Sequence, residues 1–207
     1  PDDPTPIPLP SVVPGEVHVV PYNNADALER VFKAHADSIA CIIMEPVLEN
    51  IGIVVPDMGY LERVRQLCDQ YGVLLVFDEV KTGLTAGPQG AAQRLGIKPD
   101  LIALAKSIGG GIPVAAFGGK REIMETVING KHAHLGTFNG HFLAMAGVRA
   151  VDRLCTPEAL QRCEDFNRQA LTRMSEIINE YELPAHTVGF GVKGCITWSG
   201  TPVKNLS

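Results

Sequence analysis

Short apolar runs alternate with amphipathic segments along the middle of the chain. Residues 73–77 and 101–105 are apolar without polar alternation, which is typical of strands that lie inside a parallel sheet and are buried on both faces. Residues 39–44 and 113–119 have a similar character. Between these runs, apolar residues recur at helical spacing, as they do over 57–71. The alternation predicts an α/β fold with a mostly parallel sheet and flanking helices.

The same patterns predict further elements and a division of the chain. Strands are expected over 17–20, 186–190 and 195–199, and helices over 27–36, 90–95, 121–127, 141–154 and 157–181. Residues 1–16 are rich in proline and predict an extended arm or loop. Residues 17–155 then form a large domain. Residues 156–207 form a linker helix and the start of a small C-terminal α+β domain.

Composition and charge narrow the class of protein. The 207 residues carry a net charge of −5, with a pI near 5.7, which gives no basic surface for nucleic acid. No apolar run reaches the roughly 18 residues that a membrane span needs. The five cysteines are widely spaced, so we expect reduced thiols in a cytoplasmic protein. We expect no metal site, because the loop residues His132 and His134 have no neighbouring carboxylate.

The chain does not begin with methionine and opens in a loop-like composition. We therefore expect it to be a fragment of a longer protein, with about 430 residues for the whole two-domain chain.

Two charged residues follow neighbouring apolar runs. Asp78 ends one predicted strand and Lys106 follows the next, and the carboxyl ends of parallel strands form the edge where ligands bind in α/β sheets. A lysine leaving a buried strand would lose hydration and become available as a neutral amine, which forms a Schiff base with an aldehyde. The glycines at 109–111 would let the backbone approach a ligand closely. The alternative for Lys106 is a surface lysine beside a flexible turn.

Asp78 needs a partner if it lies at the mouth of a buried strand, because an unpaired buried carboxylate is costly. A protonated pyridine nitrogen is a suitable partner. Pyridoxal phosphate requires both a carboxylate of this kind and a lysine, so the two residues together favour this cofactor. The alternative for Asp78 alone is a helix or loop cap.

Several motifs give the chain a resemblance to the class III (subgroup II) aminotransferases of pyridoxal-phosphate fold type I. The branch it resembles most contains glutamate-1-semialdehyde aminomutases and β-amino acid aminotransferases, and the resemblance covers about residues 17 to 200. The matching segments are MEP at 44–46, FDEVKTG at 77–83, PDL at 99–101, AKSIGGGIP at 105–113, AFGG at 116–119 and GTF at 136–138.

The resemblance implies a role for each of five residues. Lys106 would be the Schiff-base lysine and would carry a proton during the reaction. Asp78 would hold the pyridine N–H, and Val80 would pack on one face of the ring. Thr137 would bind the cofactor phosphate in the neighbouring subunit of a homodimer, and Glu45 would lie near the cofactor edge. The implied reaction transfers an amino group between an amino compound and a keto or aldehyde acceptor.

The chain also departs from the family pattern. It has Gly-His-Phe at 140–142, where the family usually has Gly-Asn-Pro, and Lys81 stands where other residues are common. The family's phosphate loop and its ring-stacking aromatic residue would precede residue 1. Two alternatives therefore remain open: a racemase of the same fold, and a truncated module that dimerises without catalysis. For Glu79 we expect a structural ion pair.

Overall fold

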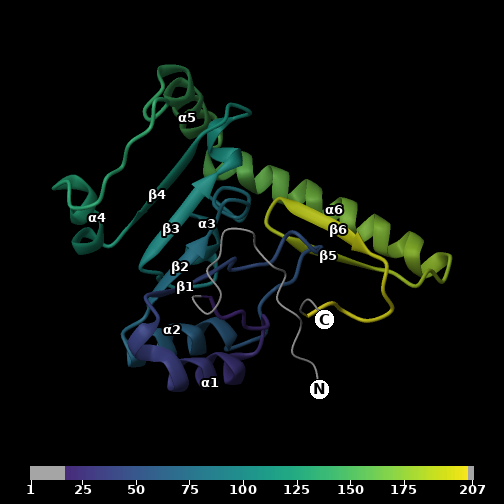
Figure 1. Cartoon of the computed structure of the whole chain (residues 1–207). Coiled ribbons are helices and arrows are strands. Elements are labelled where there is room, and N and C mark those ends of the chain that lie inside the picture. Colours follow the sequence, from purple (N-terminus) through teal and green to yellow (C-terminus); the bar gives the residue numbers. More distant parts are fainter. Residues whose placement is uncertain (1–16, 205–207) are drawn as a thin grey trace.

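The computed structural model describes residues 17–204, and its centre is a four-stranded sheet (Figure 1). The strands lie in the order β1 (Cys41–Met44), β2 (Leu74–Asp78), β3 (Leu101–Ala105) and β4 (Ala115–Gly119). The pairs β1–β2 and β2–β3 are parallel, and β4 runs antiparallel to β3. The predicted α/β fold with a mostly parallel sheet is therefore confirmed. The proline-rich arm predicted for 1–16 lies outside the described residues.

Helices surround the sheet, and a two-stranded hairpin lies to one side of it (Figure 1). The helices are α1 (Ala25–His35), η1 (Ala36–Ser38), α2 (Tyr60–Tyr71), α3 (Gly90–Arg94), η2 (Lys106–Gly109), α4 (Arg121–Ile128), α5 (Phe142–Leu154) and α6 (Pro157–Glu180). The hairpin pairs β5 (His186–Phe190) with β6 (Lys193–Thr197) and packs against α6.

The main core lies between one face of the sheet and helices α1 and α2. Phe32 of α1 and Val64 of α2 are buried against Leu75 and Phe77 of β2. Each side chain of this size contributes roughly 1.5–3 kcal/mol when it is fully removed from water. Alternate β2 residues therefore face this core, as the twofold side-chain period of a strand requires.

The opposite face of the sheet is more open than the sequence predicts. The two faces of β2 differ, because Leu75 and Phe77 are buried while Val76 is only half-buried. Ile43, which pairs with Val76, is 65% exposed, and Phe117 of β4 is 45% exposed. The prediction of strands buried on both faces is thus wrong for the described chain, because the described helices bury only one face of this strand.

Two further predicted strands differ from the structure. Residues 17–20 form no strand, and Val17 and Val19 are more than half exposed, because no strand of the described chain pairs with this short run. The last predicted strand, 195–199, is observed two residues earlier, as Lys193–Thr197. The tight turn at Gly191, with a φ of 60°, sets the start of that strand.

A buried carboxylate joins several elements at the end of the sheet where β2 and β3 begin. Asp100, just before β3, accepts hydrogen bonds from the Leu75 N–H at 2.7 Å and from Arg65 at 2.8 Å, and it pairs with Lys120 at 2.5 Å. Burial alone would raise the pKa of Asp100. The bonds from Lys120, Leu75 and Arg65 outweigh burial and lower the pKa to about 2. Asp100 therefore connects α2, β2 and the segment after β4.

Candidate active site

The pairing of the strands brings three predicted site residues to one edge of the sheet. Met44 pairs with Phe77, so Glu45 and Asp78 follow at neighbouring positions. Asp78 pairs with Ala103, and Lys106 lies three residues after Ala103, one position beyond the end of β3 at Ala105. An acid and an amine thus meet at the carboxyl edge of β1–β3.

Asp78 ends β2 and is half-buried. Its Oδ1 accepts a hydrogen bond from the N–H of Val80 at 3.0 Å. A bond of this kind holds the backbone in a turn, so the loop-cap role considered for Asp78 is present. The same bond fixes the carboxylate relative to Val80, which is also half-buried.

Lys106 is the first residue after β3, and its backbone has a φ of 51°. A positive φ is rare outside glycine and costs of order 1–3 kcal/mol, so the surrounding structure must impose it. Lys106 is exposed in the described chain. The predicted loss of hydration is therefore not produced by the described residues, because the sheet face beside the lysine is open.

The glycines after Lys106 pack against helix α5. A Cβ atom at Gly109 would lie 2.7 Å from Val114, and one at Gly110 would lie 2.9 Å from Val151. On α5, a Cβ at Gly147 would lie 2.7 Å from the carbonyl of Gly109. Close packing against Val114 and against α5 therefore accounts for two of the glycines that the sequence predicted to approach a ligand.

Glu45 follows β1 and organises the loop behind it. Its Oε2 accepts the N–H of Glu49 at 3.2 Å, and its Oε1 accepts Nδ2 of Asn50 at 3.1 Å. The carboxylate is half-buried beside the tip of β2. Glu45 therefore has a clear local structural role at the sheet edge.

Glu79 is buried, being 1% exposed, but its partners differ from those predicted. Its carboxylate accepts the N–H groups of Ala91 and Ala92 at 2.6 and 2.9 Å, and the hydroxyl of Thr82 at 3.0 Å. No ion pair to Glu79 occurs among residues 17–204, so the expected ion pair is wrong. Glu79 instead binds the start of α3 and so anchors the turn that carries Asp78.

Thr137 lies in an exposed loop that joins α4 and α5, two elements labelled in Figure 1. The loop contacts the sheet through His134, whose ring lies 5.1 Å from that of Phe117. Phe138 and Phe142, on either side of the turn, are 77% and 80% exposed. Within the described chain, Thr137 forms no hydrogen bond with Asp78 or Lys106.

No helix in 17–204 is long and apolar enough to cross a membrane. Across the same residues, no three His, Cys, Asp or Glu side chains gather as they would around a metal ion.

Comparison with known proteins shows where this arrangement belongs. A family model described as aminotransferase class III matches residues 6–200. The chain belongs to the class III aminotransferase family. It is 42% identical over 189 residues to a glutamate-1-semialdehyde 2,1-aminomutase of Thermomicrobium roseum, an alignment that covers 90% of this chain and 44% of the relative.

Solved structures of class III aminotransferases share the fold. A β-phenylalanine aminotransferase from Variovorax paradoxus matches with a TM-score of 0.88 at 32% identity, over 96% of this chain and 46% of the other. A glutamate-1-semialdehyde aminomutase from Pseudomonas aeruginosa, solved in complex with PMP, matches with a TM-score of 0.82 at 27% identity, over 96% and 47%. The predicted fold type I is confirmed. The chain spans less than half the length of these relatives.

Proposed function

We propose that the protein containing this chain transfers an amino group between an amino compound and a keto or aldehyde acceptor, with pyridoxal phosphate as cofactor. An aminomutase of the glutamate-1-semialdehyde type is included in this class of reaction. The observation that supports the proposal best is the strand pairing that brings Asp78 and Lys106 to one sheet edge, in a member of this family. We also propose the division of the chain into a cofactor-binding part at 17–155 and a linker helix with the start of a small domain at 156–207.

The residues at the edge fit the cofactor chemically. When bound, pyridoxal phosphate supplies an aldehyde and an electron-withdrawing pyridine ring. Lys106 offers an amine that binds the aldehyde carbon covalently, and Asp78 offers a carboxylate that accepts the pyridinium N–H. Because both residues stand at the carboxyl ends of adjacent parallel strands, we propose that they reach the same ring.

Each residue then has a separate task. Lys106 would hold the cofactor through its amine and, once freed from it, would carry the proton taken from the substrate carbon. Asp78 would accept the N–H of the ring nitrogen, and its bond from the Val80 N–H fixes Val80 next to that carboxylate. Glu45 lies at the neighbouring strand tip, where we propose that it borders the cofactor.

We further propose that the protein is a homodimer, with Thr137 binding the cofactor phosphate in the partner's site. The support is the exposed apolar surface around Thr137, formed by Leu135, Phe138, Phe142 and Leu143. Large apolar side chains gathered in one exposed segment are typical of protein–protein contacts. We propose a cytoplasmic location, where the five thiols stay reduced.

A turnover assay tests the reaction. The full-length protein is loaded with cofactor and incubated with a panel of amine donors and keto acids, and the new amino product is quantified, with Lys106→Ala as the control. We expect turnover by the unchanged protein and none by the Lys106→Ala variant. Racemisation of a donor without amino transfer would favour the racemase, and a protein that shows neither reaction would favour the dimerisation module.

A further inference from the structure

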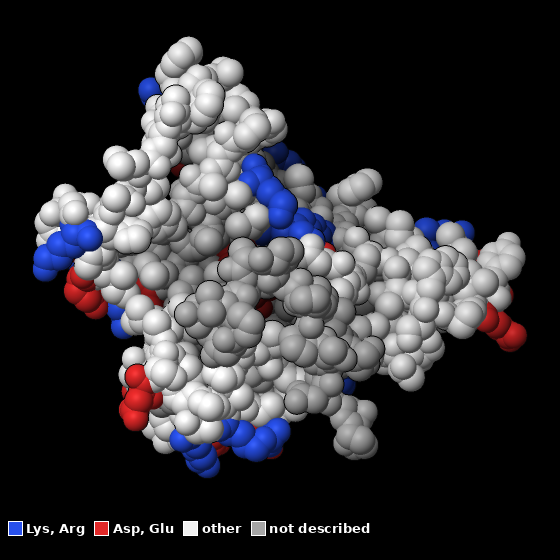
Figure 2. All heavy atoms as spheres, in the orientation of Figure 1, with Lys and Arg blue, Asp and Glu red and all other residues white. Residues whose placement is uncertain are grey.

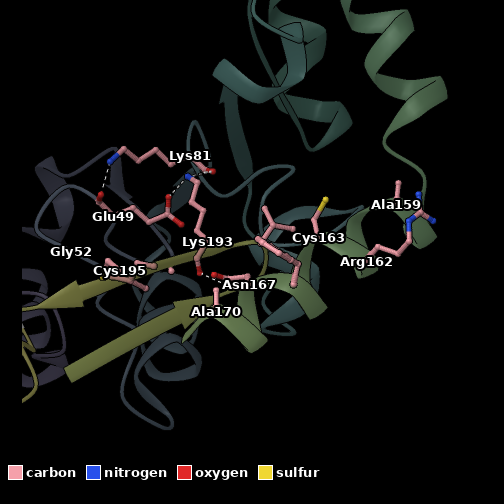
Figure 3. Close-up of a pocket in the computed structure, with 14 residues that line it drawn as sticks. Glu49, Gly52, Lys81, Ala159, Arg162, Cys163, Asn167, Ala170, Lys193 and Cys195 are labelled. Atoms are coloured by element: carbon pink, nitrogen blue, oxygen red, sulfur yellow. Dashed lines mark hydrogen bonds and ion pairs between the residues drawn. The ribbon is translucent and has the colours of Figure 1, made fainter. Parts of the chain in front are cut away.

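A cleft of about 920 Å³ separates the loop after β1 from α6 and the β5–β6 hairpin (Figure 3). None of the five predicted cofactor residues lines this cleft. Its charged end is formed by Glu49, Lys81 and Lys193. The wall beyond them is mostly apolar and includes Ile53, Ala159, Phe166, Ala170 and Val192.

Two lysines contact Glu49 at the charged end, one at its buried carboxylate and one at its backbone carbonyl. The Glu49 side chain is only 3% exposed, and its Oε2 pairs with Nζ of Lys193 at 2.5 Å. Nζ of Lys81 donates to the backbone carbonyl of Glu49 at 2.6 Å, and Lys193 also donates to the carbonyl of Lys81 at 3.0 Å. Figure 3 shows the Glu49 carboxylate beside the Lys193 amine, with the Lys81 amine at the backbone carbonyl of Glu49. Two cations beside one carboxylate leave a net positive charge, and Figure 2 shows Lys and Arg side chains gathered between the sheet and the hairpin.

The second oxygen of Glu49 is left without a donor. Among the described residues, the buried Oε1 has no hydrogen-bond partner. A buried carboxylate oxygen is costly to leave unpaired, so a donor is expected to reach it. The Lys81 ammonium has three N–H donors, and the described residues accept one of them. The charged end thus contains an acceptor without a donor and a lysine with N–H donors to spare among the described residues.

The walls of the cleft are held in place by backbone contacts. The N–H of Val192 donates to the carbonyl of Thr85 at 2.9 Å, and Asn167 of α6 donates to the carbonyls of Gly191 and Lys193 at 3.1 and 2.8 Å. Any Cβ at Gly191 would lie 2.1 Å from the Thr85 carbonyl, so the hairpin turn fits directly against the loop after β2. The cleft is therefore preformed, which favours binding of a small molecule.

We propose that this cleft binds a small organic acid that carries a hydroxyl or amino group next to its carboxylate. The carboxylate accepts hydrogen bonds from Lys81, and the adjacent donor pairs with Glu49 Oε1. An apolar substituent lies along Phe166, whose side chain is 74% exposed. The bound acid connects three segments, because Lys81 belongs to the loop after β2, Glu49 to the loop after β1 and Phe166 to α6.

The test uses 3-phenyllactate and the full-length, cofactor-loaded protein. A hydroxy acid has no amino group to transfer, so its binding does not depend on the proposed function. Cys163 is exposed and lines the cleft, and its alkylation by iodoacetamide, followed by peptide mapping, reports occupancy. We expect 3-phenyllactate to slow this alkylation saturably. Both 3-phenylpropionate, which lacks the donor, and 2-phenylethanol, which lacks the carboxylate, should bind at least about tenfold more weakly.

A matched pair of variants tests the role of Lys81. Lys81→Met should weaken the protection of Cys163 by at least about tenfold, because the carboxylate of 3-phenyllactate loses the cation that binds it. Lys98→Met removes another lysine outside this cleft and should leave the protection unchanged. The proposal is overturned if 3-phenyllactate gives no protection at about 10 mM, a concentration that fills even a weak site. It is also overturned if 3-phenylpropionate protects equally well, or if Lys81→Met binds like the unchanged protein.

Discussion

At the scale of single residues, the site depends on how two charged side chains leave their strands. Asp78 is held by its bond to the Val80 N–H, and Lys106 leaves β3 with a left-handed backbone. The bond fixes the position of Asp78 at the sheet edge, and the backbone turn fixes the position of Lys106. The chemistry proposed for the cofactor requires that Asp78 remain a carboxylate, because a neutral amide cannot hold a proton on the pyridine nitrogen.

Asp78→Asn is therefore expected to lower kcat by about 10²-fold or more, which is the usual range for losing a group that controls proton transfer. The amide oxygen can still accept the Val80 N–H, so the turn should survive. Steady-state kinetics of the full-length protein measure the effect, with Asp69→Asn on exposed α2 surface as the control. An Asp78→Asn enzyme with unchanged kcat would contradict the role given to this carboxylate.

At the scale of elements, the turn after β2 is anchored by Glu79 to the start of α3. Gly90 makes this possible, because it has a φ of 72° and a Cβ there would lie 2.5 Å from Glu79 Oε2. Gly96 has a similar φ of 69° with no atom near its missing Cβ. Substitutions at both glycines should therefore cause backbone strain, whereas only a substitution at Gly90 should also displace Glu79.

Gly96→Ala should destabilise the protein by about 1 kcal/mol through backbone strain alone. Gly90→Ala should cost roughly 1–3 kcal/mol more, because it also disturbs a buried, hydrogen-bonded carboxylate. Urea unfolding of the full-length protein measures both variants. Equal losses for the two would show that Glu79 does not anchor the turn.

Asp100 joins three elements and predicts a pH dependence of stability. Its folded pKa of about 2 lies below the value of about 3.9 for an unfolded Asp, so its contribution is complete above pH 4 and is lost as the pH falls towards 2. The shift corresponds to about 2.5 kcal/mol, of which about half is lost between pH 6 and pH 3. Urea unfolding at pH 3 and pH 6 should show this loss in the unchanged protein, and Asp100→Asn should reduce it. A loss of the same size in the variant would contradict the assignment.

The elements also show what sequence patterns can and cannot predict. Uninterrupted apolar residues made β2 and β3 recognisable, and the charged residues after them pointed to the site. The exposure of Lys106 was not predictable, because it depends on which helices cover each face of the sheet. The hydrogen bonds that Glu79 accepts from the N–H groups of Ala91 and Ala92 were equally unpredictable, since they join residues that only tertiary folding brings together. Residues 17–20 resembled a strand locally but have no strand to pair with.

At the scale of the whole molecule, the proposed homodimer makes each active site depend on both subunits. Lys106 lies at the sheet edge, whereas Thr137 lies in an exposed loop beside apolar side chains. If Thr137 serves the partner's site, a Lys106→Ala subunit paired with a Thr137→Ala subunit contains one intact site, because that site takes its lysine from one chain and its threonine from the other.

Mixing the two variants after reversible dissociation should therefore restore activity. About a quarter of the wild-type activity is expected, because half of randomly formed dimers are mixed and each has one intact site of two. Each variant alone, treated in the same way, is the control. No gain over the Thr137→Ala protein alone would show that Thr137 does not act across the interface.

The most direct measurement of the central claim is reductive trapping of the cofactor. The full-length protein is incubated with pyridoxal phosphate and reduced with borohydride, and the modified peptide is mapped by mass spectrometry. The account predicts a single major adduct on Lys106 and none in Lys106→Ala. An adduct on another lysine, or a covalent cofactor complex that persists in Lys106→Ala, would contradict it.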